Sequence, residues 1–255
     1  MPEHTTWFTF VLQHIQSTLE HNTQLIGKSY VAGQDPTWLS FEPILMSLVI
    51  AGFLVLVGII VSSKENNVDD AVIPDDSLTL RTFMEAFLGY FYDLASSVMD
   101  PARAKKYFPL IATSSCFVFF SNILALMPGM PVPTTSLSIT LGTALVVFIL
   151  FNIYGLLTNG MDYIKHLMGP AWYLAPLVFP IEVISLSVRP ITLAVRLMLN
   201  MAVDHLILSI MLGLCALILP LPVMILGCLV VVVQTLVFTL LTCIYIGLAT
   251  EHAEH

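Results

Sequence analysis

The stretch from residue 167 to residue 250 contains only four charged side chains, those of Glu182, Arg189, Arg196 and Asp204. Over the whole chain of 255 residues, 57% are hydrophobic and 10% are charged, whereas a soluble domain carries about 25% charged residues. This many apolar side chains cannot all be buried inside one globule of this size, so the bilayer is the natural solvent. The sequence therefore excludes a soluble fold and predicts an all-α integral membrane protein.

The charge balance and the motifs exclude several functions. The formal net charge of −8 and the lack of any run of Lys and Arg exclude nucleic-acid binding. The four cysteines lie in apolar stretches without CxxC spacing, which is typical of buried small hydrophobes and predicts no metal cluster. No GxSxG, HExxH or P-loop motif occurs. We therefore expect a chain that is not an enzyme by itself and holds no cofactor.

The alternation of apolar and polar stretches divides the chain into six segments. About five membrane-embedded helices are expected, together with one amphipathic surface helix at 77–98, whose apolar side is Leu80, Phe83, Phe87, Phe91, Leu94 and Val98. The segments are an external part (1–42), a first transmembrane helix (43–63), an internal linker with the surface helix (64–106), a transmembrane helix pair (107–170, spans at 107–127 and 136–157), a helical hairpin (171–250) and a polar tail (251–255).

The hairpin at 171–250 is predicted to turn at residues 219–222, where two prolines interrupt the apolar sequence. Each of its helices would exceed 25 residues, which is longer than an upright span needs, so strong tilt is expected. Basic residues gather in the loops at 63–106 and 159–170, whereas Lys28 alone precedes the first span. The positive-inside rule then places the N-terminus outside and the C-terminus inside.

Ionisable side chains at membrane depth cost about 2.5–3.5 kcal/mol or more each, so they demand a reason. Glu182, Arg189 and Arg196 are seven residues apart, which keeps them within roughly 20° of one another on a helix. Asn200 and Asp204 continue the same line with a drift of about 40° per step. This polar stripe is typical of a helix that lines water or an ion path.

The charges of the stripe could instead brace helices together. Glu182 and Arg189 could form such an ion pair. Arg196 has no acidic residue at i±3 or i±4. Its partner is therefore expected on another segment or another subunit.

The residues around Arg196 resemble a known family. The run PITLAVRLMLNMAVDHL at 190–206 closely resembles the signature of subunit a of F-type ATP synthases, in which an Arg is followed by an Asn after four residues and a Glu or His after nine. Two further blocks, QTLVFTLLTCIY at 234–245 and FSNILALMPG at 120–129 followed by PTT at 133–135, also resemble that family. Together the blocks cover nearly the whole chain in the family's order.

The chain departs from the family pattern at a few positions. Many bacterial members carry a His seven residues before the Gln, where this chain has Gly227. Because His205 occupies the partner position, the titratable group is interpreted as moved across the helix pair. Some members also carry an Asp where this chain has Ala125.

The resemblance implies a proton-translocating stator subunit. Arg196 would face a ring of c subunits, each with one membrane carboxylate, and separate two offset half-channels. Arginine suits this task because it stays charged. The inner half-channel would comprise Glu182, Ser185 and Arg189. The outer one would comprise Asn200, Asp204, His205 and Gln234 with polar lining from Asn122, Ser136, Ser138 and Thr140.

The same resemblance implies partners and a location. The expected partners are the c ring, the b-subunit peripheral stalk, the remaining ATP synthase subunits and the lipid bilayer. A bacterial plasma (inner) membrane is favoured, with the mitochondrial inner membrane as the alternative. H⁺ and Na⁺ both stay open as the coupling ion. A secondary transporter or channel that uses the stripe for a small solute is the alternative function, although no internal repeat typical of many transporters is found.

Overall fold

The computed structural model describes residues 42–63, 79–127, 130, 132–160, 175–214 and 220–250. These residues form helices and turns, and the described part contains no strand. The helices are α3 (Glu42–Ser63), α5 (Leu80–Val98), α6 (Pro101–Ile123), α7 (Leu137–Asn159), α9 (Ala175–Leu214) and α10 (Pro220–Thr250), with 3₁₀ turns η2 (Leu124–Leu126) and η3 (Pro133–Thr135). The prediction of an all-α membrane protein is confirmed. The predicted external segment 1–42 and the tail 251–255 lie almost wholly outside the described residues.

Four of these helices are long and apolar enough to cross a membrane: Glu42–Val61, Leu137–Asn159, Pro176–Leu214 and Pro220–Thr250. The predicted second span at 107–127 falls in α6, which starts earlier, at Pro101, a residue suited to the first position of a helix. Its first turns therefore carry Arg103, Lys105 and Lys106. Membrane embedding of α6 stays a prediction.

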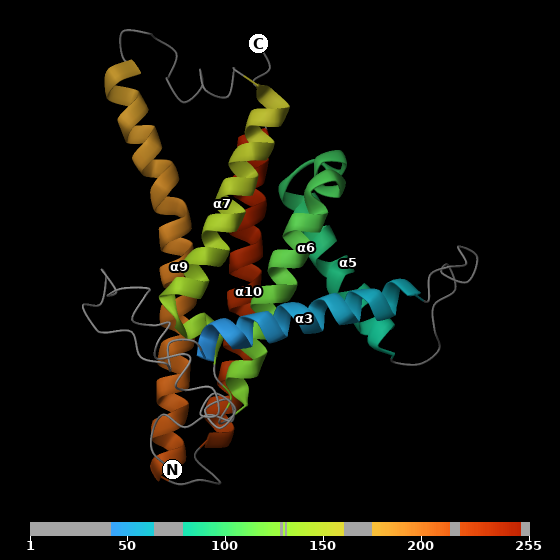
Figure 1. The fold of residues 1–255 in the computed structure, drawn as a ribbon, viewed down its shortest axis with the longest axis vertical. Coiled ribbons are helices and arrows are strands. Elements are labelled where there is room, and N and C mark those ends of the chain that lie inside the picture. Colours follow the sequence, from blue (N-terminus) through green and yellow to red (C-terminus); the bar gives the residue numbers. More distant parts are fainter. Residues whose placement is uncertain are drawn as a thin grey trace, which may run out of the picture.

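The C-terminal pair consists of two long helices, as predicted. α9 has 40 residues and α10 has 31, so α9 is about 60 Å long. That is about twice the thickness of the hydrocarbon layer, which agrees with the strong tilt expected from the sequence. In Figure 1, α3 lies crosswise to the long axes of α6, α7, α9 and α10 rather than alongside them. Pro220, predicted to lie in the turn, begins α10 instead.

Hydrogen bonds and buried apolar clusters hold α6, α7, α9 and α10 side by side. Tyr107 Oη lies 2.9 Å from Thr158 Oγ1, and Ser115 Oγ lies 2.8 Å from Thr239 Oγ1. A fully apolar cluster joins α6, α7, α9 and α10 through Val118, Ala144, Val147, Leu193, Ala194, Leu197 and Phe238. The first residues of α6 and α9 and the last residues of α7 and α10 gather at one end of the molecule (Figure 1).

The amphipathic helix α5 packs antiparallel along α6. The rings of Phe87 and Phe119 lie 4.8 Å apart, and those of Tyr92 and Phe108 lie 5.3 Å apart. On the predicted apolar side, Leu80, Phe83 and Val98 are exposed and Phe91 is buried, and Met84 and Ala95 are buried as well. A position of α5 along the membrane surface stays a prediction.

Candidate functional site

The antiparallel α9/α10 pair is held in register by two polar contacts. Asn200 Nδ2 donates a hydrogen bond of 2.7 Å to Gln234 Oε1. The guanidinium carbon of Arg189 lies 5.3 Å from the centroid of the Tyr245 ring. Arg189 is eleven residues before Asn200, and Tyr245 is eleven residues after Gln234. Because eleven residues make about three helical turns, the two contacts lie on the same seam of the pair.

Arg196 lies between these two contacts and has neither kind of partner. It is four residues before Asn200, and Phe238, four residues after Gln234, is fully buried in the apolar cluster at this level. The Arg196 side chain is exposed. Within the described residues, side-chain ion pairs join Arg81 to Glu85 and Arg103 to Asp100, and no hydrogen bond or ion pair involves Arg196. The register of the two helices thus leaves this guanidinium exposed on an apolar face of the α9/α10 pair, which we call the open face.

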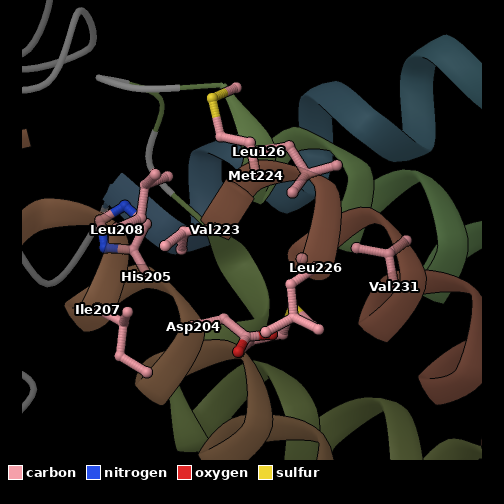
Figure 2. A pocket seen from close by; sticks show the side chains of 11 residues that line it. Leu126, Asp204, His205, Ile207, Leu208, Val223, Met224, Leu226 and Val231 are labelled. Carbon is pink, nitrogen blue, oxygen red and sulfur yellow. The ribbon is translucent and has the colours of Figure 1, made fainter. Parts of the chain in front are cut away.

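A small cavity lies beyond Asn200, toward the C-terminus of α9. It has a volume of about 60 Å³, and Asp204 and His205 both line it, although their side chains leave the helix about 100° apart. Figure 2 shows the two side chains among apolar residues of α9 and α10. The volume is sufficient for a few water molecules. The cavity therefore brings two titratable groups to one position.

A second hollow, on the open face, shares Asp204 with this cavity. This groove has a volume of about 400 Å³ and is lined by Leu199, Asn200, Val203, Asp204, Leu229, Val230, Val233 and Gln234. Asp204 lines both hollows, and its Oδ2 is buried without a hydrogen-bond partner. Asn200, Gln234, Asp204 and His205 thus form a row of polar side chains along the two hollows, which we call the polar route.

Polar atoms of α6 lie at the same level as Gln234. The Ser115–Thr239 hydrogen bond sets the register of α6 against α10, and Asn122, seven residues beyond Ser115, then falls near residues 231–235. Asn122 is fully buried, and both of its amide atoms lack a partner, as does Gln234 Nε2. Ser121 Oγ and Thr134 Oγ1 are likewise buried and unpartnered. Buried polar atoms of this kind bind water in most proteins.

The sequence did not single out Ser121 or Thr134. Thr134 lies within the block at 133–135 that resembles the family, and Ser121 directly precedes Asn122, so a signal existed for both. Their burial depends on how η3 and α6 pack, which spacing along one helix does not reveal.

Other predicted residues are less closely joined to this route. Thr140 Oγ1 donates to carbonyls of its own helix, those of Ser136 and Leu137, each at 3.2 Å. Ser138 and Ser185 are exposed, and Ser136 is half-buried at the start of α7. Glu182 is half-buried. The ion-pair brace between Glu182 and Arg189 does not form, since Arg189 lies over Tyr245 instead.

The described part of the chain contains no group of three or more His, Cys, Asp or Glu side chains that could hold a metal ion. Its chemistry is that of fixed charge, titratable side chains and water. A fixed cation favours the ionised form of a nearby carboxylate. A carboxyl group placed next to Arg196 would therefore lose its proton more readily.

Comparisons with known proteins show which family the chain belongs to. The family model "ATP synthase A chain" matches residues 44–247. The ATP synthase subunit a of Sorangium cellulosum (strain So ce56) is 56% identical over 255 residues, which is the full length of both chains. The chain belongs to the ATP synthase subunit a family. ATP synthase subunit a 1 of Syntrophotalea carbinolica is 44% identical over 69% of this chain and 74% of its own length. Subunit a of Geobacter sulfurreducens is 41% identical over 69% of this chain and 76% of its own length.

Gly227 is a position where this chain differs from the pattern of the subunit a family. The family pattern described above has a His in many bacterial members at this point, and Gly227 lines the same cavity as His205. A Cβ atom added at Gly227 would lie 2.8 Å from Leu126 Cδ2. A side chain at 227 would therefore enter space that Leu126 and the cavity now occupy.

Gly227→Ala is expected to be destabilising relative to a glycine substitution in open space. The end of the Leu126 side chain must shift, and the cost of that shift reduces the gain of about 1 kcal/mol that comes from replacing a helical glycine by alanine. Gly142→Ala in α7 is the matched control, because a Cβ there meets nothing within 4 Å. Thermal unfolding midpoints in detergent should rank Gly227→Ala below Gly142→Ala, and the reverse order would contradict the contact with Leu126.

Proposed function

We propose that this subunit a chain is the proton-translocating stator of an F-type ATP synthase and that Arg196 meets the carboxylates of a c ring. The exposure of Arg196 without a partner, on an apolar face of the α9/α10 pair, is the observation that supports the proposal most strongly. A bare guanidinium within a membrane is costly. Its cost is offset if an acidic partner on another subunit reaches it during each turn.

The outer half-channel is proposed to follow the polar route from α6 to the open face. Asn122, Gln234, Asn200, Asp204 and His205 line this route, with the unpartnered atoms of Ser121 and Thr134 as added water sites. Ser136, Ser138 and Thr140, in or next to α7, are proposed to line the side of the route that faces this helix. Water and titratable side chains would carry protons along it. The imidazole of His205 suits such a relay, since histidine titrates near neutral pH.

The inner half-channel is proposed to run along α9 from Arg196 to Glu182, past Ser185 and Arg189. This stretch of helix measures about 21 Å. The charged start of α6 lies at the same end of the molecule as the start of α9 and the end of α10, which supports a single inner side for these ends (Figure 1). On this proposal the N-terminus lies outside and the C-terminus inside.

The offset of the two routes on either side of Arg196 provides the coupling. The fixed charge blocks a direct leak and drives the proton from each arriving carboxylate. The transmembrane potential supplies about 2.3 kcal/mol per charge per 100 mV. A proton that enters outside must then ride the ring before it leaves inside, and rotation drives ATP synthesis in partner subunits. On this proposal the chain itself forms and breaks no covalent bond.

Purification and cross-linking test this assignment. A chain purified in mild detergent from its own bacterial membrane should bring a c ring, the b stalk and the nucleotide-binding subunits with it. In a background without the native cysteines, Val203→Cys should cross-link to a cysteine next to the c-subunit carboxylate, because Val203 is exposed seven residues after Arg196. Leu157→Cys, 76% exposed on α7, is the matched control. A chain that purifies alone, as a secondary transporter would, contradicts the proposal.

A further inference from the structure

The guanidinium of Arg189 lies over an aromatic ring instead of beside a carboxylate. It is 5.3 Å from the centroid of Tyr245 and half-buried, and within the described residues it makes no ion pair. The face of an aromatic ring attracts a cation, and the attraction grows as water is removed. Tyr245 of α10 is therefore the side chain that stabilises the Arg189 guanidinium.

The Tyr245 ring is itself held in place. It packs against the buried cluster that contains Phe151, Cys243 and Ile246, and its centroid lies 6.0 Å from that of Phe151. Phe151 is 2% exposed. A ring fixed in this way cannot follow a side chain that moves outward, so it acts as a stationary platform for the cation.

The two arginines of α9 differ because of what α10 places opposite each of them. They are seven residues apart and so share one face of the helix within about 20°. At the level of Arg196, α10 presents Phe238, which is 0% exposed and packed against Val118, Ala144 and Leu197. At the level of Arg189 it presents the half-buried ring of Tyr245. One cation is thus retained against α10 and the other is released to the open face.

We propose that Tyr245 is a positioning residue that holds the Arg189 guanidinium against α10, so that the face toward the rotor presents a single guanidinium, that of Arg196. This inference rests on the proposed function. Without the ring, Arg189 becomes a second exposed cation about 10.5 Å from Arg196. A rotor carboxylate that moves along the face would then meet two competing charges, and the inner path would lose its fixed cation.

A double-mutant cycle in the assembled complex tests the inference. ATP-driven proton pumping is measured in inverted vesicles and divided by the amount of assembled complex. Tyr245→Leu should lower pumping about fivefold, in keeping with the strength of a half-buried cation–π contact. Tyr245→Phe keeps the ring and should stay within about twofold of the parent. In an Arg189→Gln background, Tyr245→Leu should have no additional effect, because the cation that it releases is absent.

Tyr154→Leu is the matched control for loss of an aromatic side chain. Tyr154 packs against the same cluster and contacts the Tyr107 ring at 5.0 Å, so its effect should add to that of Arg189→Gln. Tyr245→Met serves if Tyr245→Leu does not assemble. Additive effects of Tyr245→Leu and Arg189→Gln, equal losses for Phe and Leu at 245, or failure of both Leu and Met variants to assemble would overturn the inference. Normal pumping by Arg196→Ala would instead refute the underlying function.

Discussion

Replacement of Arg196 by alanine is expected to abolish ATP-driven proton pumping while the complex still assembles. The side chain is exposed and makes no hydrogen bond or ion pair within the described part of the chain, so its removal leaves no buried partner unsatisfied. A rotor carboxylate at this point loses the cation that lowers its pKa. Each unit by which the pKa of the carboxylate then rises makes the loss of its proton about 1.4 kcal/mol less favourable. We expect a fall of at least about 100-fold, measured as acidification of inverted vesicles.

Arg196→Lys separates charge from shape in the same assay. Lysine keeps the positive charge but lacks the planar fork of donors that binds a carboxylate with two hydrogen bonds, so pumping should be impaired without vanishing. Arg103→Ala is the control for loss of an arginine, since Arg103 pairs with exposed Asp100 near the start of α6 and such surface pairs contribute about 0–1 kcal/mol. Unchanged pumping by Arg196→Ala would refute the assigned role.

The spans and the polar stripe were predictable because both depend on one helix at a time. Apolar length set the bounds of α3 to within two residues, and seven-residue spacing placed Glu182, Arg189 and Arg196 on one face. The same reasoning indicated that Arg196 has no partner within its own helix. These features follow from the geometry of a single helix, which sequence spacing determines directly.

Contacts between helices were not predictable in this way. That α10 presents Phe238 to Arg196 and Tyr245 to Arg189 depends on the register of the pair, which packing of the whole bundle decides. For α5, the spacing of apolar residues did not indicate which part of the helix packs against the bundle: Leu80 and Phe83 are exposed, whereas the small Ala95 is fully buried. The Glu182–Arg189 brace failed for the same reason, because a ring from another helix competed for the guanidinium.

The second large effect is expected when Asp204 and His205 lose their titratable groups together. Both line the cavity of about 60 Å³, and Asp204 also lines the groove next to Asn200. Either group alone can exchange protons with water in the cavity, so Asp204→Asn and His205→Ala should each lower pumping only a few-fold. The double variant leaves no titratable side chain in the lining and should lose about 100-fold, the contribution of a positioned proton-transfer group.

A measurement of passive proton flow tests whether this loss of pumping arises in the half-channel itself. With the nucleotide-binding subunits stripped from the vesicles, the double variant should conduct protons about 100-fold more slowly than the parent, while the complex still assembles. Ser209→Ala is the matched control, because Ser209 is exposed on the same helix and its hydroxyl bonds only to the Leu206 carbonyl at 2.8 Å. Full conduction by the double variant would show that protons reach the rotor by another route. Protons would then have to travel from the proposed water sites at Ser121, Asn122 and Thr134 to the rotor without passing Asp204.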